Sequence, residues 1–140
     1  MSLIVTNDSK VLMLEIVLNK RTTDGSPPSS SGDRRLKLFV NNLVPSLTTQ
    51  IEDITECSSM GYEAKTLFGS SWSVETVDGT TSASYGEQTF DIEEEVLIYG
   101  YYVTSYDGTQ LLWVERFSGA PYTLPVGGGS IGITLNFNLN

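Results

Sequence analysis

Histidine, the residue type most often used in enzyme chemistry, is missing from this chain. The sequence of 140 residues contains no histidine and a single cysteine, Cys57. A Ser-His-Asp centre, a histidine-ligated zinc site and an intrachain disulfide are therefore excluded. A lone thiol is typical of a protein made in a reducing cytoplasm, and we expect Cys57 to be structural.

The chain carries 17 carboxylates, but their spacing forms no recognisable centre. The adjacent glutamates Glu93–Glu95 would suit calcium only if they converged, and neighbouring residues of a strand point to opposite faces. An exposed acidic turn is expected instead. Any β-protein with 17 acidic residues also offers carboxylate pairs of the kind that cleave glycosides. Here the candidates are Glu75, Glu87, Asp91 and Glu115.

Two further patterns resemble catalytic motifs only in part. Gly127–Gly129 and Ser130 lack the lysine and the helix that a phosphate-binding loop requires. Ser70, Ser71 and Ser73 have no base to activate them. We therefore expect no enzyme activity, no metal and no cofactor.

Aromatic residues gather in one predicted hairpin, Val96–Thr104 with Gln110–Phe117. Tyrosine supplies a large contact area with a polar tip, which suits protein interfaces and sugar binding. Half of these aromatic side chains are expected to line the core instead. As candidate contact residues we select Tyr99, Tyr101 and Tyr106.

Strand patterns predict the elements that would position these residues. Asp107-Gly108 between two apolar runs is a strong hairpin signal. Apolar and polar residues alternate throughout Ile131–Asn140, which predicts a half-buried antiparallel strand. Val96–Val103 is apolar on both faces and predicts a central strand, covered on its outer side by a second sheet or subunit.

The rest of the chain is also read as strands and turns. Further strands are expected at Val11–Asn19, Leu36–Asn41, Tyr62–Phe68, Trp72–Val77 and Tyr85–Ile92, with a tight turn at Asp78-Gly79 and one weak helical turn at Ile51–Glu56. These patterns predict an all-β antiparallel sandwich of jelly-roll type, with less than about a tenth of the residues helical. An immunoglobulin-like sandwich is the second choice.

The chain is expected to form one domain with an N-terminal extension. Residues 1–35 would be an arm or first strand followed by a Pro/Ser-rich loop, and residues 36–140 the sandwich body. The net charge of −9 is unevenly distributed, because residues 1–37 carry +2 and residues 38–140 carry −11. Such a charge excludes nucleic-acid binding by the whole surface. The longest apolar run is too short to span a membrane, and no signal peptide is recognised.

The N-terminal segment Met1–Asn19 is the main candidate for binding a partner. Leu3, Ile4 and Val5 are apolar or β-branched residues that a solvated tail does not need. An extended segment of this kind can bind the edge of a sheet. Basic residues follow it in the sequence, and they would steer it toward an acidic partner. These residues are Lys10, Arg21, Arg34 and Arg35. The alternative is that Val11–Leu18 is simply the first strand of the sandwich.

One segment resembles a known family. Leu36–Pro45 is similar to the L-x-L-F/Y-x-N-N-x-x-P opening of small structural proteins of tailed phages, notably those of cyanobacterial phages. Spaced similarities continue to residue 140, at Gly61-Tyr62, Trp72, Tyr85–Phe90, Ile98–Val103, Leu111–Phe117 and Pro121-Tyr122.

The resemblance implies a capsid cement or decoration protein. Such a protein would be made in the host cytoplasm, would sit on the virion surface and would bind the major capsid protein, typically as a homotrimer. A carbohydrate-binding module of a phage tail or baseplate is the alternative.

Overall fold

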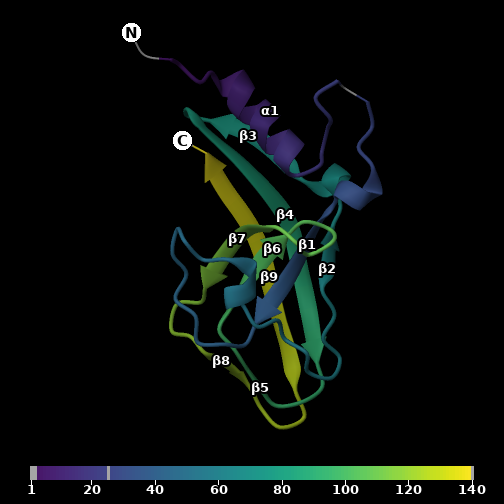
Figure 1. Ribbon diagram of the computed structural model, residues 1–140, viewed down its shortest axis with the longest axis vertical. Coiled ribbons are helices and arrows are strands. Elements are labelled where there is room, and N and C mark those ends of the chain that lie inside the picture. The colour runs from purple at the N-terminus through teal and green to yellow at the C-terminus, as the bar shows by residue number, and fades with distance from the viewer. Residues whose placement is uncertain (1–2, 25, 140) are drawn as a thin grey trace. The chain divides into compact units, whose positions relative to one another are not determined.

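The computed structural model describes residues 3–24 and 26–139 (Figure 1). Strands hold 41% of the residues and helices 15%. The sheets are antiparallel and the fold is sandwich-like, so the predicted all-β class is confirmed. The jelly-roll connectivity stays a prediction. The expectation that less than a tenth of the chain is helical is wrong.

The described residues contain one α-helix, three 3₁₀ turns and nine strands. In chain order they are α1 (Asn7–Val17), η1 (Ser30–Gly32), β1 (Arg34–Phe39), η2 (Ile51–Asp53), β2 (Lys65–Leu67), η3 (Gly69–Ser71), β3 (Ser73–Val77), β4 (Thr80–Ile92), β5 (Val96–Ile98), β6 (Gly100–Thr104), β7 (Leu111–Arg116), β8 (Tyr122–Leu124) and β9 (Gly129–Leu139). The strands form three sheets, with the orders β2-β1-β6-β7, β3-β4-β9 and β5-β8.

The chain divides into two compact units. The first comprises the described residues of Met1–Asp33, Leu67–Glu87 and Ile133–Asn140, and the second comprises Arg34–Thr66 and Gln88–Gly132. The long strands β4 and β9 contribute residues to both units.

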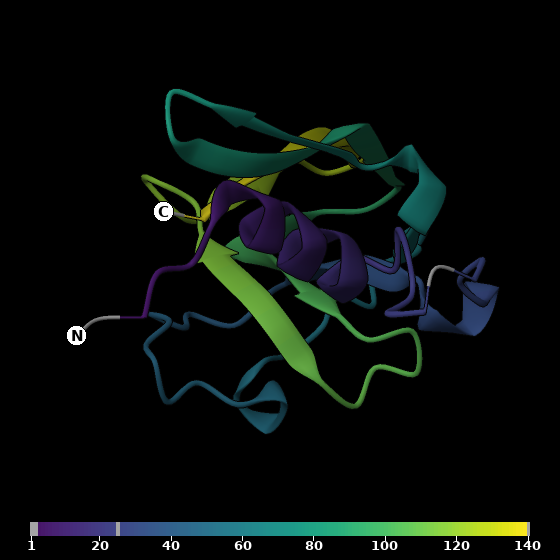
Figure 2. The same cartoon turned by 90° about the horizontal axis from the view of Figure 1, so that it is seen from above.

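The N-terminal segment is helical, which corrects the prediction of a strand at Val11–Asn19. Thr6 begins the helix, because its hydroxyl accepts a hydrogen bond from the Ser9 amide at 3.2 Å. Leu14 and Leu18 lie four residues apart and are both buried. The helix lies along β3 of its own unit (Figure 2).

The end of α1 is set by Asn19, which adopts a left-handed conformation with φ of 62°. The Lys20 amide donates to the Glu15 carbonyl at 2.7 Å, and the Asn19 amide donates to the Ile16 carbonyl at 3.1 Å. This pair of bonds is a Schellman motif, which satisfies carbonyls that the last helical turn leaves open. Asparagine tolerates the required conformation better than most residues.

The core of the first unit is built around Trp72, which is 1% exposed. Its ring meets Tyr85 edge-on at 5.0 Å and Phe137 at 5.8 Å between ring centroids. The Tyr85 hydroxyl accepts a hydrogen bond from the Phe68 amide at 3.0 Å, and thereby fixes the chain before η3. The tight turn expected at Asp78-Gly79 is confirmed, because both residues have positive φ and join the paired strands β3 and β4.

The second unit contains the predicted aromatic hairpin. Strands β6 and β7 pair in antiparallel register, with Tyr102 opposite Val114. Strand β1 lies on the other side of β6, with Leu38 opposite Tyr101. Gly108 has φ of 78°, as the predicted Asp107-Gly108 turn requires. The hairpin prediction is confirmed.

The prediction that Val96–Val103 is one central strand is wrong. The chain divides at Tyr99 into β5 and β6, and β5 pairs with β8 in a separate two-stranded sheet. Leu97, in the middle of β5, is 43% exposed. Gly100 allows the crowding at this division, because a Cβ there would lie 2.1 Å from the Glu115 carbonyl oxygen.

Two shorter predictions hold. The alternation expected over Ile131–Asn140 matches β9, in which Ile131, Ile133 and Leu135 are buried. The helical turn expected at Ile51–Glu56 is η2.

Candidate interaction surfaces

The N-terminal arm, defined as Leu3–Val5, presents apolar side chains before α1. Leu3 is 95% exposed, Ile4 80% and Val5 47%. The arm has a fixed base, because Thr6 caps the helix with its hydroxyl and its carbonyl accepts from the Lys10 amide at 3.0 Å. Asp8 lies in the first turn, where its negative charge interacts favourably with the positive end of the helix dipole. The arm is therefore an apolar segment attached to an ordered helix.

The basic residues predicted to accompany the arm are divided between the units. Lys10 is half-buried on α1, and Arg21 is 3.6 Å from Glu15 in a partly exposed ion pair of small energetic value. Arg34 and Arg35 begin β1 and belong to the second unit. The structure therefore places two of the four basic residues in the same unit as the arm.

Arg35 and Tyr106 are brought together at the tip of the aromatic hairpin. The Arg35 guanidinium lies over the Tyr106 ring, 5.5 Å from its centroid. The Arg35 Nε is buried and has no hydrogen-bond partner among the described residues. Tyr106 is 44% exposed. Arginine and tyrosine are the residue types enriched at interface hot spots, so this pair is a candidate contact point.

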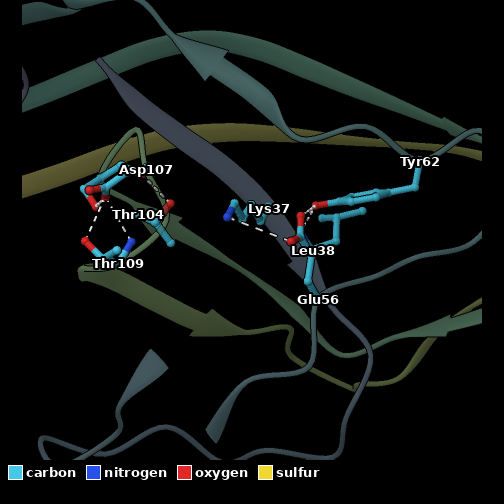
Figure 3. Close-up of polar contacts among 8 residues, drawn as sticks. Lys37, Leu38, Glu56, Tyr62, Thr104, Asp107 and Thr109 are labelled. Atoms are coloured by element: carbon cyan, nitrogen blue, oxygen red, sulfur yellow. Dashed lines mark hydrogen bonds and ion pairs between the residues drawn. The ribbon is translucent and has the colours of Figure 1, made fainter. Parts of the chain in front are cut away.

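The turn that carries Tyr106 is held by Asp107 (Figure 3). One oxygen of its carboxylate accepts hydrogen bonds from the Ser105 hydroxyl at 2.7 Å, the Thr109 hydroxyl at 2.8 Å and the Thr109 amide at 3.1 Å. These bonds, with that from Ser105 first, lower the pKa of Asp107. The turn is thus ordered by local bonds to an ionised carboxylate.

The other two predicted contact tyrosines are engaged within their own unit. The Arg116 guanidinium lies 5.3 Å from the Tyr99 ring centroid. The Tyr101 hydroxyl donates to Glu115 at 2.6 Å. Burial, and then this bond, raise the pKa of Tyr101. Both side chains are half-buried, so Tyr106 is the most exposed of the three.

A polar cluster on β1 was missed by the sequence analysis (Figure 3). The Tyr62 hydroxyl donates to Glu56 at 2.7 Å and accepts from the Leu38 amide at 3.2 Å. The Lys37 ammonium lies 3.9 Å from the other oxygen of Glu56. Burial, followed by the bond to Glu56, raises the pKa of Tyr62 far above its ordinary value. The phenol stays protonated and serves as a clamp between chain segments. No sequence motif marks this cluster, because it joins Glu56 and Tyr62 to a strand that lies about 20 residues earlier in the chain.

A hollow of about 180 Å³ lies in the first unit. Its floor contains Asp33, which is 6% exposed and accepts hydrogen bonds from the Asn19 amide group at 2.9 Å and the Gly69 amide at 3.0 Å. Lys20 and the exposed ring of Phe68 also line it. The Lys20 ammonium donates to the Trp72 carbonyl at 2.6 Å. The hollow combines an aromatic face with polar groups, which suits a small polar ligand.

The acidic turn Glu93–Glu95 is exposed, as expected. Glu94 accepts a hydrogen bond from the Met60 amide at 2.8 Å. Within residues 3–24 and 26–139, no three His, Cys, Asp or Glu side chains are placed to hold a metal ion together. Cys57 is buried and forms no disulfide with any described residue. None of the helices in these ranges is long and apolar enough to cross a membrane.

Comparison with known proteins supplies no relative for these surfaces. The chain matches no protein-family model, and no curated protein or solved structure is detectably similar to it. The resemblance to phage structural proteins therefore stays a prediction.

Proposed function

We propose that the protein is a non-enzymatic structural component of a virion, which decorates the capsid by binding the major capsid protein. The observation that carries the proposal is the arm. Leu3 and Ile4 are largely exposed, Val5 is about half exposed, and the capped helix α1 follows them directly. Burying such side chains in a partner is favourable, at about 1.5–3 kcal/mol for each large aliphatic group.

The remaining features support attachment to another protein. The exposed ring of Tyr106, with the half-buried Arg35 over it, supplies a second contact of the kind found at interfaces. The resemblance of Leu36–Pro45 to phage structural proteins adds the identity of the partner and the homotrimeric state.

Deletion of residues 1–5 tests this function without removing the Thr6 cap of α1. The probe is the capsid shell of the phage that encodes the chain, purified from particles lacking the protein. We expect the truncated protein to bind these shells at least about tenfold more weakly in co-sedimentation, with an unchanged melting temperature. A full-length variant with serine at positions 3, 4 and 5 should show the same loss. Unchanged binding by both variants would overturn the role of the arm, and failure of the wild-type protein to bind would overturn the function.

Carbohydrate binding by a tail or baseplate protein is the second candidate, and the hollow beside Phe68 favours it. Aromatic rings with neighbouring polar groups suit sugar rings, and Phe68 is 54% exposed. A glycan array probed with the wild-type protein and with Phe68→Ala separates the two functions. Binding that disappears in Phe68→Ala would favour a carbohydrate-binding module over a capsid protein.

A further inference from the structure

A second apolar projection occurs in the loop between β1 and η2. This loop, Asn41–Gln50, lies in the second unit and runs along the lower edge of the view in Figure 2. Leu47 is 107% exposed and Val44 is 73% exposed. Single exposed aliphatic residues are common on protein surfaces and need no function. What distinguishes this loop is how the rest of it is held.

Both ends of the loop are fixed by side chains. The Asn41 amide group donates to the Asp53 carbonyl at 2.9 Å and accepts from the Thr55 amide at 2.9 Å. On β7, the Arg116 guanidinium donates to Asn42 at 2.8 Å and to the Leu43 carbonyl at 3.0 Å. A charged donor with two acceptors is a strong restraint. The backbone that leads to Val44 is therefore attached to the sheet.

The polar groups around Leu47 bond to one another. The Ser46 amide donates to the Thr49 hydroxyl at 2.8 Å, and the Thr49 amide donates to the Ser46 carbonyl at 3.1 Å. The Thr48 amide donates to the Ser46 hydroxyl at 3.2 Å. The loop thus satisfies much of its own hydrogen bonding, while the side chains of Val44 and Leu47 remain exposed.

The sequence of the loop is also free of charge. No Asp, Glu, Lys or Arg occurs from Asn41 through Ile51, in a protein whose net charge is −9. The core of a protein interface is depleted in charged residues, whereas solvated surface is enriched in them. Two aliphatic side chains cover far less than the ~800 Å² per partner of a standard interface, so a dimer formed through this loop alone would be unstable. The loop fits a subsidiary contact within a larger interface.

We infer that Val44 and Leu47 form a pre-organised apolar knob that inserts into an uncharged apolar pocket on the capsid shell. The inference rests on the proposed function and gives the shell a second point of attachment besides the arm. Because the loop is already held in place, binding orders few additional residues, which favours affinity. A projecting pair of aliphatic groups requires a concave partner surface, and an acidic or basic groove would leave its own charges unpaired against the knob.

The test compares Leu47→Ser, the double variant Val44→Ser/Leu47→Ser, and Val126→Ser as the matched control. Val126 is an exposed aliphatic residue of the same unit, 85% exposed, on a different loop. The probe is again the purified shell lacking the protein. We expect about tenfold weaker binding for Leu47→Ser, about a hundredfold for the double variant and no change for Val126→Ser. Melting temperatures should be equal for all four proteins.

Each outcome separates this inference from the proposed function. Equal binding by the wild-type protein and both loop variants would overturn the knob and leave the function intact. An equal loss of binding in Val126→Ser would also overturn it, because nonspecific hydrophobic binding by exposed aliphatic residues would then explain the effect. A melting temperature lowered by Leu47→Ser would contradict the free position of this side chain. No binding by the wild-type protein would overturn the function, and the knob with it.

Discussion

Helix α1 and the β6–β7 hairpin begin from similar apolar runs and adopt opposite structures. Val11–Leu18 contains leucine, methionine and glutamate, which lose little side-chain freedom in a helix. The hairpin contains tyrosine, valine and threonine, which pack well on a pleated surface. The decisive difference lies at the ends. Thr6 and Asn19 bound the helix, whereas Asp107-Gly108 turns the hairpin. An apolar run shows that a segment is partly buried, and its boundaries show how it folds.

The largest expected effect concerns the face of α1 that packs on its unit. Leu18 is fully buried, so Leu18→Ala should lower the free energy of unfolding by about 3 kcal/mol. Leu12 is 39% exposed, and Leu12→Ala should cost less than about 1 kcal/mol. Urea denaturation followed by circular dichroism measures both. Equal losses in the two variants would mean that the segment does not present one face of a helix to the core.

The corresponding change in the hairpin is Gly100→Ala. Its Cβ would lie 2.1 Å from the Glu115 carbonyl oxygen and 2.5 Å from the Phe39 ring, so we expect a loss of about 2 kcal/mol. Gly86→Ala on β4 is the matched control, because a Cβ there has no atom within 4 Å. A Gly100→Ala protein as stable as the control would show that β6 and β7 are further apart than described.

Alkaline pH should weaken the second unit through Tyr62. The raised pKa keeps the folded phenol protonated, while the unfolded phenol loses its proton above about pH 10. Stability is therefore full below that pH and falls as the pH rises above it. Tyr62→Phe should cost about 1.5 kcal/mol at neutral pH, because the bonds to Glu56 and the Leu38 amide are lost.

Denaturation at about pH 8 and about pH 10.5 provides the comparison. The wild-type protein should lose more stability between these two values than Tyr62→Phe does. Parallel losses in the two proteins would contradict the assigned role of Tyr62. Tyr101 and Tyr102 also have raised pKa values, so some alkaline sensitivity should remain in the variant.

The smallest effect is expected at the start of α1. Thr6→Ala removes the side-chain acceptor of the Ser9 amide and should cost about 1 kcal/mol. Thr6→Ser keeps the acceptor and should be close to neutral. Helical circular dichroism should decrease slightly for the alanine variant only. A segment that is a strand, as the apolar run first indicated, would respond equally to both substitutions.

The parts of the fold that the sequence predicted are those specified by local signals. Two tight turns were predicted because each contains an Asp-Gly pair, at Asp78-Gly79 and Asp107-Gly108. One strand was predicted because apolar and polar residues alternate along Ile131–Asn140. The helix was missed because Thr6 lies before the apolar run and was not considered as a cap. The division at Tyr99 was missed because the crowding at Gly100 comes from Phe39 and Glu115, which are distant in sequence.

The candidate surfaces, like the fold, were predictable from the sequence only in part. Leu3–Val5 were selected as contact residues because a solvated tail does not need apolar side chains, but nothing in the sequence predicted how exposed they are. Two other contacts depend on the register of the strands and the path of the loops, which a single sequence does not specify. They are the Arg35–Tyr106 pair and the Tyr62–Glu56 clamp. The knob at Val44 and Leu47 depends on bonds from Asn41 and Arg116, and the latter lies 74 residues beyond Asn42.

Photo-crosslinking from the arm tests most directly whether the ordered helix presents Leu3–Val5 to a partner. A benzophenone amino acid replaces Ile4, which is 80% exposed, and a control carries it at Glu95, an exposed residue of the acidic turn. After binding to shells that lack the protein, irradiation should join position 4 to the major capsid protein and give little product from position 95. Crosslinks from position 4 that stay within its own chain, in a protein that still binds the shell, would contradict the account.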